Sequence, residues 1–187
     1  MASAEAEAAS AAAARRGDGE MDIKRIVKHL LSTRRQVNRA FPGESLLAIE
    51  RAIKESETAH VGEIRFAVEA ALDGAPLFRG QSPRERAIEL FSLLRVWDTE
   101  HNNGVLIYLL LAERQVELVA DRGLNRHVDA AHWQRITEAM ATAFRGGQFE
   151  SGINQAIDAV HALLMQHYAV DATQANPNEL PDAPLFL

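Results

Sequence analysis

The sequence predicts an α/β protein, a three-layer α/β/α sandwich with a small mixed sheet on a βαββ core. Residues 62–70, GEIRFAVEA, alternate apolar and charged side chains with the period of a strand. A strong helix start at Ser82 follows, and then the continuous apolar run VLIYLLL at residues 105–111. Because a strand–helix–strand unit forms a right-handed parallel crossover, these two strands should be parallel. QVELVA at residues 115–120 follows so short a turn that it should pair antiparallel with the apolar run, which makes the sheet mixed.

Length and composition fit one globular domain with tails. The chain has 187 residues, of which 47% are hydrophobic and 25% charged, enough to bury a sizeable core. No apolar run approaches the ~18 residues that a membrane-spanning helix needs, and the N-terminus lacks the pattern of a secretory signal. We therefore expect a cytoplasmic protein without a transmembrane segment. It would be a peripheral membrane protein if part of its surface binds a membrane.

Charge and cysteine content exclude several classes of function. The formal net charge is −6, whereas nucleic-acid binding favours a basic surface, so no nucleic-acid partner is expected. The chain has no cysteine, which excludes disulfides, thiolate zinc sites and cysteine-nucleophile enzymes, cysteine-dependent phosphatases among them.

Shifts in composition divide the chain into four parts. Residues 1–20 are rich in Ala and Glu and carry no apolar side chain larger than Ala after Met1, so they are expected to form a disordered tail. Residues 21–42 are expected to form a basic amphipathic helix, and residues 43–169 the α/β/α domain. Residues 170–187, which contain several prolines, are expected to form an extended tail whose apolar end lies on the domain.

The basic helix has two faces. Its apolar residues recur at helical spacing, and residues 23–41 contain no acidic side chain; the basic ones are Lys24, Arg25, Lys28, Arg34, Arg35 and Arg39. One interpretation is that this segment docks on an anionic membrane surface or on an acidic protein partner. The other is that its apolar face packs on its own domain and its basic face is solvated.

Within the domain, the first strand is expected to be half-buried. Its apolar residues, such as Ile64 and Phe66, point to one side, and Glu63, Arg65 and Glu69 point to solvent. Ser82 and Glu85 form a capping-box pattern with proline between them, which is a strong helix start. Further helices are expected over residues 44–58, around Trp133–Phe144, and from Phe149 to about Tyr168.

Polar residues crowd the two ends of the predicted hairpin. The antiparallel pairing places the segment before the apolar run beside the segment after QVELVA, so the two loops should converge. The carboxylates and amides of these loops supply oxygen ligands without sulfur, a set that suits Ca²⁺ or Mg²⁺. The candidate metal ligands are Asp98, Glu100, Asn102, Asn103 and Asp121. The alternative is an ordinary solvated turn, because Asn–Gly before a strand is a common turn without any ligand.

Other residues near the same loops have candidate roles. Arg122 and Gly123 would offer a guanidinium and a close backbone approach to a phosphate, although Gly123 also fits a simple turn. His101 and His127 are candidates for a general acid or base, against the alternative that they are solvated. The chain contains no Gly-rich phosphate loop, nucleophile elbow or metalloprotease motif.

The chain resembles the TPM domain family over residues 44–168. The matching segments are GEIRFAVEAAL, RERAIELFSLLRVWDTEHNNGVLIYLLLAERQVELVADRG and AFRGGQFESGINQAIDAV. The resemblance implies an α/β/α sandwich, divalent-cation binding by acidic loops in some members, and acid phosphatase activity in the plant branch. Its loop ligands correspond here to Asp98, Asn103 and Asp121. This chain departs from many relatives in reading ADRGLNRH where they have a glycine-rich segment, and in showing no signal peptide or C-terminal hydrophobic helix.

These observations leave more than one function open. We favour a binding or assembly module in which a divalent cation braces the acidic loops. The alternative is a metal-dependent phosphatase of phosphomonoesters, in which Asp98 and Asp121 would hold a cation that activates water and Arg122 would neutralise charge. A scaffold that binds no metal is the third hypothesis.

Overall fold

The computed structural model describes residues 23–170 and 177–187, so the expected tail at residues 1–20 lies outside the described residues. Its sheet contains β1 (Ile64–Glu69), β2 (Val105–Leu110), β3 (Gln115–Ala120) and β4 (Leu185–Phe186), in the order β3-β2-β1-β4. β1 and β2 are parallel, whereas β2 and β3 are antiparallel. The predicted crossover and hairpin are both confirmed.

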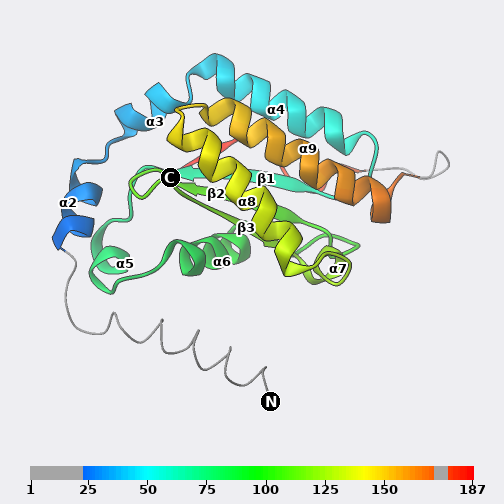
Figure 1. The fold of residues 1–187 in the computed structure, drawn as a ribbon. Helices are drawn as coiled ribbons and strands as arrows, with labels where there is room; N and C mark the ends of the chain where they lie inside the picture. The colour runs from blue at the N-terminus through cyan, green and yellow to red at the C-terminus, as the bar shows by residue number, and fades with distance from the viewer. Residues whose placement is uncertain (1–22, 171–176) are drawn as a thin grey trace.

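Helices cover both faces of this sheet (Figure 1). The helices are α2 (Ile23–Leu31), α3 (Arg34–Ala40), α4 (Gly43–Glu57), α5 (Gly74–Phe78), α6 (Pro83–Leu93), α7 (Arg122–Asn125), α8 (Ala130–Arg145) and α9 (Phe149–Tyr168). One core lies between the sheet and α4, α8 and α9, and the other between the sheet and α5 and α6. The predicted three-layer sandwich is confirmed. Within the described ranges, no helix combines the length and apolarity needed to cross a bilayer.

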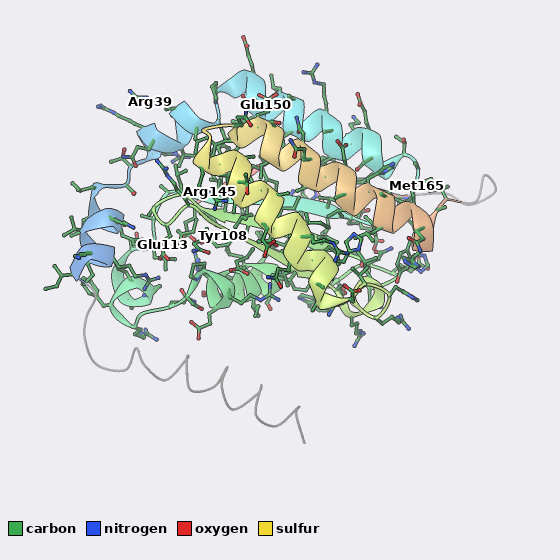
Figure 2. All side chains as sticks on the ribbon, viewed as in Figure 1. Arg39, Tyr108, Glu113, Arg145, Glu150 and Met165 are labelled. Carbon is green, nitrogen blue, oxygen red and sulfur yellow. The ribbon has the colours of Figure 1, made fainter. Side chains whose placement is uncertain are left out.

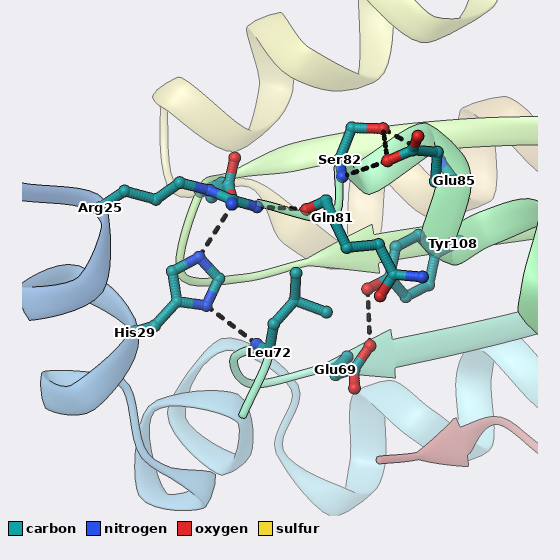
Figure 3. Close-up of polar contacts among 9 residues, drawn as sticks. Arg25, His29, Glu69, Leu72, Gln81, Ser82, Glu85 and Tyr108 are labelled. Carbon is teal, nitrogen blue, oxygen red and sulfur yellow. Dashed lines mark hydrogen bonds and ion pairs between the residues drawn. The ribbon is translucent and has the colours of Figure 1, made fainter. Parts of the chain in front are cut away.

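β1 is buried on both faces, so the expectation of a half-buried strand is wrong. The charged residues of this strand are all buried: Glu63, Arg65 and Glu69. The face that was expected to be solvated is covered by α5, by α6 and by residues 177–187, which we call the C-terminal segment. The charges at the end of the strand are compensated. Glu69 accepts two hydrogen bonds from Arg86, each at 2.9 Å. It accepts a third from the Tyr108 hydroxyl at 2.7 Å (Figure 3).

The single basic helix expected over residues 21–42 is also wrong, because the described part of it forms two helices. α2 ends at Leu31 and α3 begins at Arg34. Between them Thr33 is extended, with φ −128° and ψ 157°, and its amide donates to the Gln36 side chain at 3.3 Å. Thr33 therefore acts as the N-cap of a new helix and interrupts the first one.

The C-terminal segment is attached to the end of the sheet where β1 begins. The Glu63 carboxylate accepts hydrogen bonds from the backbone amides of Glu179 and Leu180, each at 3.1 Å. β4 then pairs in parallel with β1. Glu57 is buried at this same end and accepts a hydrogen bond from the Ile64 amide at 2.9 Å. Burial raises the pKa of the Glu57 carboxyl to about 9.

The raised pKa of Glu57 predicts a pH-dependent cost in stability. The folded protein keeps this carboxyl neutral up to about pH 9, whereas the unfolded chain ionises it near its ordinary pKa of 4.5, so stability falls as the pH rises between these values. Glu57→Gln cannot ionise and should become more stable relative to wild type over that range, by about 1 kcal/mol or more at the alkaline end. Urea unfolding at several pH values measures this difference. Glu55→Gln, an exposed neighbour on α4, is the matched control, and a pH-independent difference for Glu57→Gln would contradict the assignment.

The hydrogen bond between Tyr108 and Glu69 predicts that removal of the Tyr108 hydroxyl lowers the stability of the protein measurably. Tyr108 is fully buried, and its phenol donates to a carboxylate that also holds Arg86. Tyr108→Phe should lower the free energy of unfolding by about 1 to 2 kcal/mol, because Glu69 loses one of its donors. The other tyrosine, Tyr168, is half-exposed, so Tyr168→Phe should lower the free energy of unfolding by less in the same urea titration. Equal losses for the two variants would show that the buried hydroxyl contributes no special stability.

Candidate functional site

The two polar loops meet at one end of the sheet, as predicted. The antiparallel register pairs Val105 with Ala120, and the Asp121 amide donates to the Gly104 carbonyl at 2.9 Å. The parallel register places the start of β1 at the same end, where the Val105 amide donates to the Glu63 carbonyl at 2.8 Å. The backbone pairing of β2 with its two neighbours therefore determines which side chains gather there.

Asn103 is the most completely buried of the predicted ligands, at 0% exposure. Its backbone amide donates to the Thr99 hydroxyl at 3.1 Å, and its side-chain nitrogen donates to the Val61 carbonyl at 3.0 Å. These contacts orient the amide group and leave its oxygen, Oδ1, without a hydrogen-bond partner among the residues described. Buried polar atoms are usually paired, so this oxygen is a candidate ligand atom.

Asp121 is buried to 8% exposure beside the same loop. Its Oδ1 accepts a hydrogen bond from the Arg122 amide at 2.6 Å, which caps α7. Its second oxygen, Oδ2, is buried and has no hydrogen-bond partner in the described part of the chain. An uncompensated carboxylate oxygen is costly to bury, so a cation or another external group would stabilise it.

Gly123 holds the two loops in close contact. Its amide donates to the Asn102 carbonyl at 2.8 Å, and a Cβ at this position would collide with the carbonyl oxygens of His101 and Asn102. Asn102 itself has a φ of 52°, a left-handed conformation that Asn tolerates better than most residues. The glycine is thus accounted for by this close backbone approach, whether or not a ligand binds.

Arg122 is directed at the neighbouring loop. Its side chain is exposed, and its Nε donates to the Asn102 Oδ1 at 2.9 Å. This bond uses one of the oxygens that was predicted as a metal ligand. The guanidinium therefore links the two loops in this conformation.

The carboxylates of Asp98 and Glu100 face solvent. Asp98 forms an exposed ion pair with Arg95 in the turn after α6. Glu100 contributes its backbone amide, which donates to the Glu179 carboxylate at 3.0 Å. Among the described residues, no group of three or more His, Asp or Glu side chains is close enough to hold a metal ion. The structure thus brings the backbone of the loop that carries Asn103 beside Asp121, and the carboxylates of Asp98 and Glu100 remain at the surface.

The two histidines singled out in the sequence are exposed. His127 stacks on His167 of α9, with ring centroids 4.6 Å apart and planes inclined by 14°. A different pair was not anticipated: His60 packs beside His161 at 5.2 Å between ring centroids, and burial, with a smaller effect of His161, lowers the pKa of His60 to about 4. No spacing pattern in the sequence links these two histidines.

Sequence reasoning also missed the residues that orient Asn103. The hydroxyl of Thr99 and the carbonyl of Val61 hold it, and Val61 lies 42 residues away in the chain. Thr99 stands inside the polar segment DTEHNNG, and its position four residues before Asn103 was the available signal. The role of Val61 is a backbone contact, which side-chain chemistry does not reveal.

Comparisons with known proteins bear on the fold and the family of this chain. The chain is similar to the BA42 protein of the psychrophilic bacterium Bizionia argentinensis, with 25% identity and a TM-score of 0.68 over 78% of this chain and 94% of that one. It has the fold of the N-terminal domain of a P. gingivalis protein, with 20% identity and a TM-score of 0.55 over 69% of this chain and 81% of that one. No curated protein matches it. The sequence model of the TPM domain matches residues 39–163, more than half of the chain, which therefore belongs to the TPM domain family.

Proposed function

We propose that this TPM domain binds a divalent cation at the loop end of its sheet, and that the cation braces the loops of a binding module. The observation that carries the proposal is the pair of buried oxygens without hydrogen-bond partners, Asn103 Oδ1 and Asp121 Oδ2. Each belongs to a side chain whose other polar atom is engaged, so each is fixed in place by the fold.

The chemistry of these atoms suits a hard cation. One carboxylate oxygen and one amide oxygen are typical ligands of Ca²⁺ and Mg²⁺, which also retain bound water in sites with few protein ligands. The backbone carbonyl oxygens of His101 and Asn102 lie against Gly123, where the two loops touch. They are further oxygen atoms near the candidate site. With a single formal negative charge among these groups, the site would bind its cation weakly.

Binding is better supported than phosphoester hydrolysis. Arg122, the residue expected to neutralise a phosphate, already donates to Asn102. His101 and His127 are exposed, and His127 is engaged with His167. No specific contact among the described residues favours catalysis, so the proposal is limited to the cation and its effect on the loops.

Thermal unfolding with and without a cation tests this proposal. A cation at about 100 times its dissociation constant should stabilise the wild type by roughly 2.7 kcal/mol. For a chain of this size the melting temperature should rise by about 5 to 10 °C over the value in EDTA. Asp121→Asn keeps an oxygen that can cap α7 but removes the carboxylate charge and Oδ2, so it should lose this response.

Two variants serve as controls in the same experiment. Asp129→Asn alters another aspartate that caps a helix, α8, with an oxygen 2.6 Å from the His132 amide, and it should respond like the wild type. Asp98→Ala should also respond fully, because that carboxylate pairs with Arg95 at the surface. If Asp98→Ala abolished the shift while Asp121→Asn kept it, the site would be misplaced. If the wild type did not shift at any Ca²⁺ or Mg²⁺ concentration of a titration held at constant ionic strength, the proposal would fail.

A further inference from the structure

α2 presents its apolar residues to solvent. Ile23, Val27, Leu30 and Leu31 are exposed to 71%, 46%, 70% and 68%. Their spacing of four, three and one residues puts them on one side of the helix, and we call these four residues the apolar stripe. Ile26 borders this stripe, three residues after Ile23 and four before Leu30, and it packs partly into the core beneath α5 and α6. The interpretation that the apolar face of this segment packs on its own domain is therefore wrong for the stripe.

Polar contacts on the opposite side of α2 hold this orientation (Figure 3). His29 is 3% exposed; its Nδ1 accepts a hydrogen bond from the Leu72 amide at 2.9 Å. Nδ1 is thus the acceptor, so Nε2 carries the proton and donates to Glu113 at 2.9 Å. Arg25 donates to the same carboxylate at 2.8 Å and to the Gln81 carbonyl at 2.5 Å. Turning the stripe inward would break all four bonds.

Basic side chains lie along one edge of the stripe and on the next helix. Lys24 and Lys28 are exposed and each follows a stripe residue, so they lie along one edge of it. Arg34, Arg35 and Arg39 are exposed on α3, and Arg39 extends away from the body of the molecule (Figure 2). Residues 23–41 hold six basic side chains and no acidic one, a formal charge of +6 within a chain of −6, so the other residues carry −12.

We propose that the apolar stripe and the flanking cations of α2 and α3 bind an anionic lipid surface, with the stripe inserted at the level of the head groups. An amphipathic helix with apolar residues on one side and lysines beside them is suited to such an interface. The net negative charge of the other residues would be repelled by the same surface, which would orient the molecule with α2 toward the lipid.

Two observations favour lipid over a second copy of the chain. Pairing two stripes would bring together two segments that each carry a charge of +6, and like charges at an interface oppose association. α2 also lies at the outer margin of the molecule, clear of α4, α8 and α9 (Figure 1), so a bilayer can approach it. The lipid proposal goes beyond the proposed function and is independent of the cation.

Vesicle co-sedimentation of the full chain in EDTA tests the proposal. The protein should sediment with vesicles that mix phosphatidylcholine and phosphatidylglycerol, and should stay in solution with phosphatidylcholine alone. Binding should weaken as salt is added, because exposed cations are screened. Failure to bind the anionic vesicles would overturn the proposal.

Matched variants separate the stripe from general surface effects. Leu30→Asp should reduce the bound fraction roughly tenfold or more, because it places a carboxylate in the stripe. Leu93→Asp, on α6 at 65% exposure, is the control for an equally exposed leucine and should bind as the wild type does. Lys24→Glu/Lys28→Glu should lose binding, whereas Arg51→Glu/Lys54→Glu, an exposed pair on α4, should lose much less. Thermal unfolding verifies that each variant is folded, and equal binding by Leu30→Asp and Leu93→Asp would contradict the role of the stripe.

The absence of cysteine permits a direct test of insertion. Leu31→Cys, labelled with an environment-sensitive fluorophore, should shift to shorter wavelength on anionic vesicles and be quenched by spin-labelled lipid. The same label at Leu93→Cys should do neither. If Leu31→Cys shifted without vesicles as the protein concentration rose, the stripe would bind a second copy and the lipid proposal would be wrong. Because these experiments are done in EDTA and the cation titration is done without lipid, failure of one proposal is distinguishable from failure of the other.

Discussion

The register of β2 against its two neighbours is the constraint on which the rest of this structure depends. β2 is fully buried, and it pairs in parallel with β1 and antiparallel with β3 over its whole length. Its side chains alternate between the two cores, so a slip of one residue would exchange the faces. The same register places the loop before β2 beside Asp121, because the Asp121 amide bonds to the Gly104 carbonyl. The candidate cation site is thus a consequence of strand pairing, and its candidate ligand atoms come from the two loops that flank the β2–β3 hairpin.

The fold buries charge at both ends of β1, and each end uses it differently. At the start of the strand, Glu63 holds the C-terminal segment through two backbone amides, and Glu57 stays neutral beside it. At the end of the strand, Glu69 is bonded to Arg86 and Tyr108. The first arrangement attaches a distant segment to the sheet end where the polar loops meet. The second ties α6 to the sheet, and the helix leads directly into the loop that carries Asn103.

Local patterns in the sequence predicted the strands and helix starts, because these depend on residues that are close together in the chain. The alternation in β1, the apolar run in β2 and the capping box at Ser82 all reflect short-range rules, and the Ser82 hydroxyl accepts from the Glu85 amide as expected. The meeting of the loops before β2 and after β3 also followed, because a short turn between these strands pairs them antiparallel. The burial of Glu63 and Glu69 did not follow, since alternation identifies a polar face but gives no sign that helices and a C-terminal segment cover it. The orientation of α2 depends on a contact between His29 and Glu113, 84 residues apart, which no helical periodicity contains.

A cation bound between the two loops should be visible in the amide chemical shifts of the isotope-labelled full chain. The most direct measurement is therefore a titration with Ca²⁺ or Mg²⁺ followed by two-dimensional NMR. Saturable shifts should be confined to residues 99–104 and 121–125, with Gly123 as the clearest reporter because its amide bonds to the Asn102 carbonyl. Shifts that do not saturate and that follow the exposed carboxylates of Asp98 and Glu100 would contradict a site built on the two buried oxygens.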